Sequence, residues 1–154
     1  MARKTQISKE VILEKAFQML LREGYGNINI TTLAKEIGCS TQPIAWHFGN
    51  MDGLRGELLT YSLEFLKNYY SVQGEEVSSV LEGIAGQYIN LALDYPNLYK
   101  YIYISEHDGE KMIQIANSLR AKNRDKILQM LQKEYGMTEQ KAKEYLMNLQ
   151  IYVH

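Results

Sequence analysis

Apolar residues recur at spacings of three and four along nearly the whole chain, and few stretches alternate with a period of two. The first spacing keeps apolar side chains on one face of an α-helix, whereas alternation is typical of a half-buried strand. Only two prolines interrupt the pattern. The sequence therefore predicts an all-α fold.

Three helices are predicted in the first 50 residues. The first covers residues 8–23, where Ser8 can accept a hydrogen bond from a backbone N–H of the first turn. Gly24 ends it, because glycine readily adopts the left-handed conformation that closes helices. Ile28 and Ile30 lie in the following connector, and we expect both side chains to point into the core.

The next two helices are short and closely spaced. The second begins at Thr31 or Thr32, either of which can cap it. A tight turn leads to the third helix, residues 41–48, with Ser40 as its expected cap and Pro43 in its first turn, where a missing N–H has no helical partner to lose. Two such helices form a helix-turn-helix, whose second helix can enter the major groove of DNA.

Further helices are predicted throughout the remainder of the chain. The breaks between them fall at Tyr95-Pro96 and at residues 107–109, because proline and glycine interrupt helices. The predicted segments run from Met51 or Asp52 to Tyr70, over residues 76–94, 97–106 and 109–135, and from Thr138 to His154.

Charge and cysteine content narrow the class of protein. Residues 1–50 carry six lysines and arginines against four glutamates, and the remainder carries eleven against fourteen acidic residues. The N-terminal part is therefore the one that tolerates an anionic partner. No leader peptide is recognisable, and the longest weakly charged stretch, residues 83–93, is too short to cross a bilayer. The lone Cys39 cannot form an internal disulfide, so we expect a cytoplasmic protein.

A spaced pattern in the first third of the chain resembles the DNA-binding head of the tetracycline-repressor (TetR) family. It comprises TTLAKEIGCS at residues 31–40, IAWHFGN at residues 44–50, and Leu54. A capped amphipathic helix ending in Glu23-Gly24-Tyr25 precedes it. The match covers about residues 8–58 and involves more than ten positions, which makes it more specific than a single short motif.

The resemblance implies a transcriptional regulator, expected to be a repressor that a small-molecule effector releases from a near-palindromic DNA operator. A helix-turn-helix DNA-binding domain would span residues 1–50, and a helical ligand-binding and dimerisation domain residues 51–154. We expect a homodimer without a cofactor, a metal or an enzymatic activity. The chain ends within an apolar helical run that has no stop signal, so we expect the last part of the family's usual dimer interface to be missing.

Carried over position by position, the family's DNA-contacting sites fall on Thr31, Thr32, Thr41, Gln42, Pro43, Trp46 and His47. Gln42 is the best candidate for reading a base, because its amide can both donate to and accept from adenine. His47 can bond either a phosphate or a group of its own chain. The alternative for Trp46 and His47 is that they pack the head against the fourth helix.

Two positions depart from the family's pattern. Ala45 stands where the family usually has an aromatic residue, commonly tyrosine, and Met51 stands where it usually has a phosphate-binding lysine. Both changes remove expected contacts to the DNA backbone, which weakens salt-sensitive binding rather than the fold. They permit an alternative function, a helical ligand- or partner-binding protein that has lost strong DNA affinity.

The second part of the chain is rich in tyrosine and methionine, which can line an effector pocket or fill a core. The wider set comprises Tyr88, Tyr95, Tyr99, Tyr101, Tyr103, Met112, Met130, Tyr135 and Tyr145. From it we assign Tyr88, Tyr99, Tyr103 and Met130 to the effector site. The only dense cluster of metal-ligating side chains, Glu106-His107-Asp108, is interpreted as a helix-breaking loop, and no phosphate-binding glycine-rich loop is present.

Overall fold

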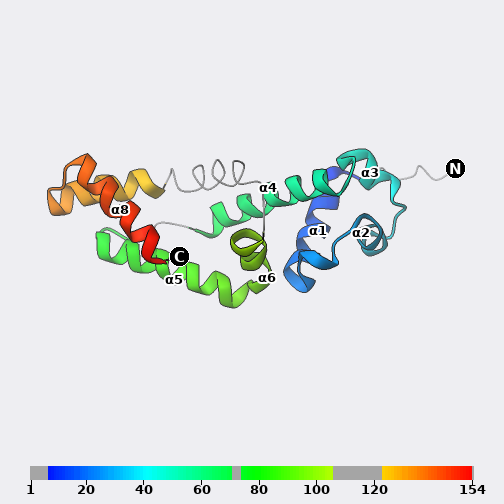
Figure 1. Cartoon of the computed structure of the whole chain (residues 1–154), viewed down its shortest axis with the longest axis horizontal. Coiled ribbons are helices and arrows are strands. Elements are labelled where there is room, and N and C mark those ends of the chain that lie inside the picture. The colour runs from blue at the N-terminus through cyan, green and yellow to red at the C-terminus, as the bar shows by residue number, and fades with distance from the viewer. Residues whose placement is uncertain (1–6, 71–73, 106–122, 154) are drawn as a thin grey trace. The chain divides into compact units, whose positions relative to one another are not determined.

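The structure, a computed structural model, describes residues 7–70, 74–105 and 123–153. Within these residues it contains helices and their connections and no β-strand (Figure 1). The all-α class predicted from the apolar spacing is therefore confirmed. Every helix across the same residues is too short or too polar to span a lipid bilayer.

The chain forms two compact units. Unit 1 consists of residues 1–65 and 91–106, and unit 2 of residues 66–90 and 107–154. The functional boundary expected at residue 50 stays a prediction. The packed unit that holds the helix-turn-helix is larger than 50 residues.

Helix α1, Lys9–Glu23, begins as the sequence predicts. Ser8 Oγ accepts a hydrogen bond from the backbone N–H of Val11 at 3.4 Å, and Gly24 closes the helix with a φ of 83°. A 3-10 turn, Tyr25–Asn27, follows. The buried face of α1 supplies much of the core of unit 1 through Ile12, Leu13, Ala16, Phe17, Met19 and Leu20.

Helix α2, Ile30–Ile37, has a different cap from the one predicted. Asn29 Oδ1 accepts hydrogen bonds from the backbone N–H groups of Thr31 and Thr32 at 3.0 and 2.9 Å. The Thr32 hydroxyl accepts one in return from the Asn29 N–H at 3.0 Å. The prediction of a threonine cap is wrong, because the asparagine immediately before the helix already satisfies its first N–H groups.

One isoleucine of the connector enters the core and the other does not. Ile28 is buried as predicted, whereas Ile30 is half-buried and forms the first residue of α2. The prediction for Ile30 is therefore wrong. Within α2, Leu33 and Ala34 are buried, and Ile37 is only half-buried.

Helix α3, Gln42–Phe48, follows a turn in which Gly38 adopts a left-handed φ of 78°. Thr41, not Ser40, occupies the N-cap position, and no side chain caps the helix. The backbone of Thr41 is already helical, with φ −70° and ψ −15°, whereas a capping side chain normally requires an extended residue. The predicted Ser40 cap is therefore wrong, while Pro43 lies in the first turn as expected.

Helix α4, Met51–Tyr69, ends one residue before the predicted limit. Asn50 Oδ1 accepts a hydrogen bond from the N–H of Gly53 at 3.0 Å and so caps the helix. Its buried side chains are Leu54, Leu58, Leu59, Ser62, Leu63 and Leu66.

Two short helical segments complete unit 1. Helix α6, Pro96–Tyr99, continues as a π-helix over Lys100–Ile104, in place of the single helix predicted for this stretch. The Asn97 side chain donates to a backbone carbonyl of α1 at 3.1 Å. The buried Tyr101 donates its hydroxyl to the backbone carbonyl of Arg55 at 3.1 Å. These two bonds join α6 and its extension to α1 and α4.

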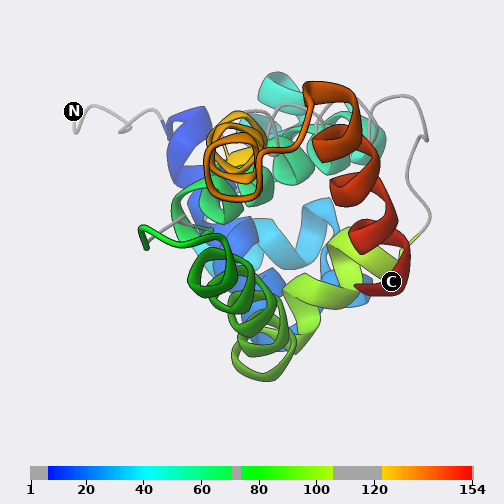
Figure 2. The same cartoon turned by 90° about the vertical axis from the view of Figure 1, so that its left-hand side faces the viewer.

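Unit 2 contains most of α5, Val77–Asp94, a helix over residues 123–135, and α8, Glu139–Val153. Figure 2 looks onto this unit, with α8 in red following residues 123–135 in orange. Thr138 Oγ1 accepts a hydrogen bond from the N–H of Lys141 at 3.3 Å and so caps α8. Residues 109–122, expected to begin the middle helix, and His154 lie outside the described residues.

The core of unit 2 joins α5, the helix over residues 123–135 and α8. Glu134 Oε2 accepts a hydrogen bond from the N–H of Val77 at 2.9 Å, so a side chain from residues 123–135 holds the first turn of α5. The buried core consists of Val77, Val80, Ile127, Leu128, Leu131 and Ala142, with Leu81, Ile84, Met130, Met137 and Leu146 packed against it.

Candidate nucleic-acid interface

Helix α3 has one buried and one exposed face. Ile44 and Phe48, four residues apart as on one face of a helix, are buried in unit 1. Four side chains on the remaining surface are exposed, namely Thr41, Gln42, Ala45 and Trp46. The buried pair anchors the helix, so the exposed side chains are presented on a fixed backbone.

Trp46 is 72% exposed, which makes it one of the most exposed large apolar side chains in the described structure. The alternative in which it packs the head against the fourth helix is therefore wrong. Its indole ring instead meets the imidazole of His47 in an edge-on arrangement, with ring centroids 4.6 Å apart. The indole thus has a neighbour that restricts its position on the surface.

His47 links α3 to the chain that precedes α1. Its Nε2 lies 3.0 Å from the backbone oxygen of Ile7, and since a carbonyl only accepts, Nε2 carries the donated proton. The partly buried ring is consistent with the bond within the chain that the sequence left open. Lys9, two residues after Ile7, lies 5.9 Å from the Phe48 ring centroid and forms an ion pair with Glu57 at 2.8 Å.

The two threonines at the start of α2 differ in their surroundings. The Thr32 hydroxyl donates to the backbone oxygen of Asn27 at 2.9 Å and also accepts from Asn29, so it belongs to the cap. Thr31 is exposed. In α3, Pro43 is half-buried in the first turn.

The junction between α3 and α4 depends on a glycine whose importance the sequence reasoning missed. A Cβ at Gly53 would lie 2.0 Å from the backbone oxygen of Phe48, closer than any real contact. The same oxygen accepts a hydrogen bond from the N–H of Asn50 at 2.9 Å. A glycine in the first turn of a helix costs stability, so its presence was a signal that two backbone segments approach each other closely.

Several cations of unit 1 are paired with carboxylates. Arg22 contacts Glu23 at 2.6 Å and Glu36 at 3.2 Å, and its hydrogen bonds first with Glu23 and then with Glu36 raise its pKa. These exposed pairs leave less positive charge for an anionic partner.

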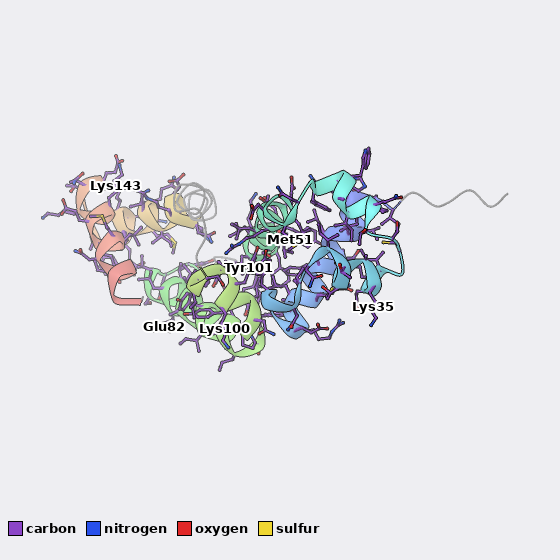
Figure 3. The ribbon with its side chains drawn as sticks, turned by 45° about the vertical axis from the view of Figure 1, so that its right-hand side comes forward. Lys35, Met51, Glu82, Lys100, Tyr101 and Lys143 are labelled. Atoms are coloured by element: carbon purple, nitrogen blue, oxygen red, sulfur yellow. The ribbon has the colours of Figure 1, made fainter. Side chains whose placement is uncertain are left out.

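Two other positions bear on charge near the helix-turn-helix. Lys35 is exposed and projects outward from α2 (Figure 3). Met51 is half-buried at the start of α4, and residues 41–50 contain no lysine, arginine, aspartate or glutamate. The surface around α3 therefore offers hydrogen bonds and apolar contacts more than charge.

The residues assigned to the effector site are divided between the units. Tyr99 and Tyr103 lie in unit 1 with ring centroids 5.1 Å apart, whereas Tyr88 and Met130 lie in unit 2. Met130 packs against the core of unit 2.

Unit 2 also contains an open hollow of about 320 Å³. Tyr135 and Tyr145, both from the wider tyrosine set, lie on its wall, and none of the four assigned residues does. Its lining residues are Val77, Ser78, Leu81, Leu131, Tyr135, Met137 and Tyr145.

Other positions singled out in the sequence lie outside the described residues, namely Met112 and Glu106-His107-Asp108. Among the residues that are described, no three histidine, cysteine, aspartate or glutamate side chains gather in a way that could hold a metal ion.

Comparison with known proteins adds information on the fold. No family model matches the sequence, and no curated protein matches it. Among solved structures, the chain is similar to a Vibrio parahaemolyticus protein described as a TetR-family transcriptional regulator, with a TM-score of 0.60 and 13% identity over 95% of this chain and 88% of that chain. The fold is a TetR-type fold. At this identity the likeness concerns the fold alone, and it agrees with the helix-turn-helix head and helical body expected from the sequence.

Proposed function

We propose that the chain is a DNA-binding transcriptional regulator, a repressor that binds a near-palindromic operator as a homodimer and leaves it when a small effector binds. The proposal rests on the fact that α3 has one buried face and one exposed face. Ile44 and Phe48 anchor it while Gln42 and Trp46 are exposed. A short anchored helix with hydrogen-bonding and apolar side chains on its outer face suits a major groove about 12 Å wide.

The proposed DNA-contacting residues have different roles. Gln42 reads a base, since its amide donates and accepts, and the exposed Thr31 and Thr41 hydroxyls bond phosphates. Pro43 and Trp46 contribute contact surface, and Thr32 positions the start of α2 through its cap. His47 positions α3, and because its Nε2 proton is used by Ile7, it donates to a phosphate only when the imidazole is protonated.

The decisive test is a footprint on the DNA upstream of the protein's own coding sequence. It would be repeated with Gln42→Ala and with Gln18→Ala, an exposed glutamine of α1 in the same unit. We expect Gln42→Ala to reduce discrimination between the protected site and random DNA by about 1–3 kcal/mol and Gln18→Ala to leave it unchanged. An equal loss on specific and random DNA would refute base reading by Gln42.

The effector part of the proposal is supported by the hollow in unit 2. Its volume of about 320 Å³ is at the lower end of the range for small-molecule sites, and Ser78, Tyr135 and Tyr145 provide hydroxyls within an otherwise apolar wall. An effector alters operator affinity only if it favours one of two conformations. Thermal-shift screening supplies stabilising compounds, and the inducer mechanism would be abandoned if each of them left operator affinity unchanged.

Ala45 and Met51 favour a second candidate function, a ligand- or partner-binding protein without strong DNA affinity. Both positions lack the backbone-contacting groups that the resemblance implies. The two functions are distinguished by measuring how much of the wild-type chain stays bound to duplex DNA as the salt concentration is raised. A DNA-binding regulator with few phosphate contacts but good base contacts keeps part of its affinity.

A further inference from the structure

The exposed side chains of α3 are of a restricted chemical kind. They comprise the amide of Gln42, the methyl group of Ala45, the indole of Trp46 and the hydroxyl of Thr41. In the major groove, guanine is read mainly by arginine or lysine and cytosine by acidic side chains, and none of these occurs in residues 41–50. Adenine is read by amides, and the thymine methyl group by apolar side chains.

Gln42 is placed where an amide can reach a base. It is the first residue of α3, and the N-terminal residues of a recognition helix are the ones that approach base edges. Its side chain is exposed, while the neighbouring turn of the helix is held by the buried Ile44. An amide in this position can accept from N6 of adenine and donate to N7.

The apolar part of the face lies next to Gln42. Ala45 and Trp46 follow it by three and four residues, a spacing that brings side chains together on one side of a helix. The indole meets His47 at 4.6 Å, and His47 is held to Ile7 at 3.0 Å, so the large apolar surface has a supported position. The only apolar group on a major-groove base edge is the thymine 5-methyl group.

We infer that α3 reads adjacent A·T base pairs, with an adenine bound by Gln42 and the 5-methyl group of a neighbouring thymine contacted by Ala45 and Trp46. This inference rests on the proposed DNA-binding function and adds to it the class of base pair that the protein selects.

The first test selects binding sites from a randomised double-stranded DNA library with the full chain. Enrichment of sites whose half-site core contains adjacent A·T pairs supports the inference. Enrichment of a G·C core overturns it and leaves DNA binding standing. If no duplex is enriched and the chain does not bind duplex DNA, the proposed function and this inference fail together.

The second test changes single atoms in one enriched duplex. Replacing the thymine by deoxyuridine removes only the methyl group and should weaken binding about fourfold, the effect of one buried carbon at about 0.8 kcal/mol. Replacing the adenine by 7-deazaadenine removes the acceptor and should weaken binding about 5- to 150-fold. Gln42→Ala should abolish the effect of 7-deazaadenine, and Trp46→Ala should reduce the effect of deoxyuridine.

Gln18→Ala is the matched control for these variants and should retain both effects in full. Circular dichroism verifies that each variant keeps its helix content. Unchanged affinity for both modified duplexes, or full retention of the 7-deazaadenine effect by Gln42→Ala, would overturn the assignment of base contacts while operator binding itself remained intact.

Discussion

Met51 is a residue at which a single substitution should strengthen the proposed DNA binding. It begins α4 and is half-buried, and the resemblance implies a phosphate-binding lysine there. We expect Met51→Lys to tighten operator binding by about 1.5–3 kcal/mol per subunit at low salt, the usual contribution of a hydrogen bond to a charged group. The salt dependence should become steeper by about one phosphate contact per subunit.

The control for this substitution is Asn90→Lys, which adds the same charge at an exposed position of α5 in unit 2. Affinity is measured by titration of a labelled operator at several salt concentrations. Equal gains for the two variants would mean that net charge, not a local phosphate contact, is responsible.

Tyr101 is a second residue whose chemistry gives a measurable effect. Burial raises its pKa above the ordinary value of 10, with the nearby Tyr25 hydroxyl adding to the rise. Above about pH 10 the unfolded chain therefore loses this proton while the folded chain keeps it, so the free energy of unfolding falls as pH increases.

We expect Tyr101→Phe to lower the free energy of unfolding by about 1 kcal/mol near neutral pH, because the hydrogen bond to the Arg55 carbonyl is lost. The variant should also lose less stability above pH 10. Urea denaturation across this pH range measures both effects, and parallel curves for the two proteins would contradict the role of this hydroxyl.

At the scale of elements, the connection between α3 and α4 determines how the recognition helix is held. The close approach of Gly53 to the Phe48 carbonyl leaves no room for a side chain. We expect Gly53→Ala to lower the free energy of unfolding by about 1–3 kcal/mol, as overpacking does, and to weaken operator binding in protein that remains folded.

Gly83→Ala is the matched control, since a Cβ at this helical glycine of α5 would meet nothing within 4 Å. It should stabilise the protein by up to about 1 kcal/mol, because alanine has the higher helix propensity. Thermal unfolding measures the stability of both variants, and operator titration measures their affinity for DNA. If Gly53→Ala stabilised the protein, the predicted clash between the new Cβ and the Phe48 carbonyl would be contradicted.

The element scale also shows which features local sequence rules predict. The Ser8 cap is predictable because this residue directly precedes a helix and no better acceptor competes, and Thr138 caps α8 in the same way. Asn29 was missed because the start of α2 was placed beyond it, and Ser40 was wrongly chosen because Thr41 is already helical. Small errors in a helix boundary therefore move the cap to the wrong residue.

Longer-range features were less predictable. The inward positions of Ile44 and Phe48 follow from helical spacing alone, whereas the bond from His47 to Ile7 joins residues 40 positions apart. Likewise, spacing could not show that Tyr99 and Tyr103 belong to a different unit from Tyr88. Pairings that depend on tertiary packing leave no periodic signal in a single sequence.

At the scale of the whole molecule, DNA binding depends on the proposed pairing of two chains. Two heads held about 34–36 Å apart can occupy two half-sites one helical turn apart, whereas a single head makes few contacts. Light scattering at micromolar concentration should give twice the chain mass of 17.8 kDa. A strict monomer that still protects a palindromic site tightly would contradict this requirement.

We predict that helix α8 is the pairing surface of the proposed dimer, and Tyr145 is its testable residue. Tyr145 is 40% exposed, so an aspartate can replace it without entering a core. We expect Tyr145→Asp to shift the mass toward that of one chain. Tyr135→Asp, which changes a 55% exposed tyrosine of the same unit, should leave it unchanged. Equal masses for both variants and the wild type would place the interface elsewhere.

The exposure of Trp46 also gives the molecule an optical reporter of its own. The chain contains a single tryptophan, and it stands on the outer face of α3, so selectively excited indole fluorescence comes only from the proposed recognition surface. Bound DNA should shield the indole from a dissolved quencher such as acrylamide. Trp46 is not among the residues that line the hollow of unit 2, so a change in its emission when a compound binds there would indicate that unit 1 responds to an event in unit 2.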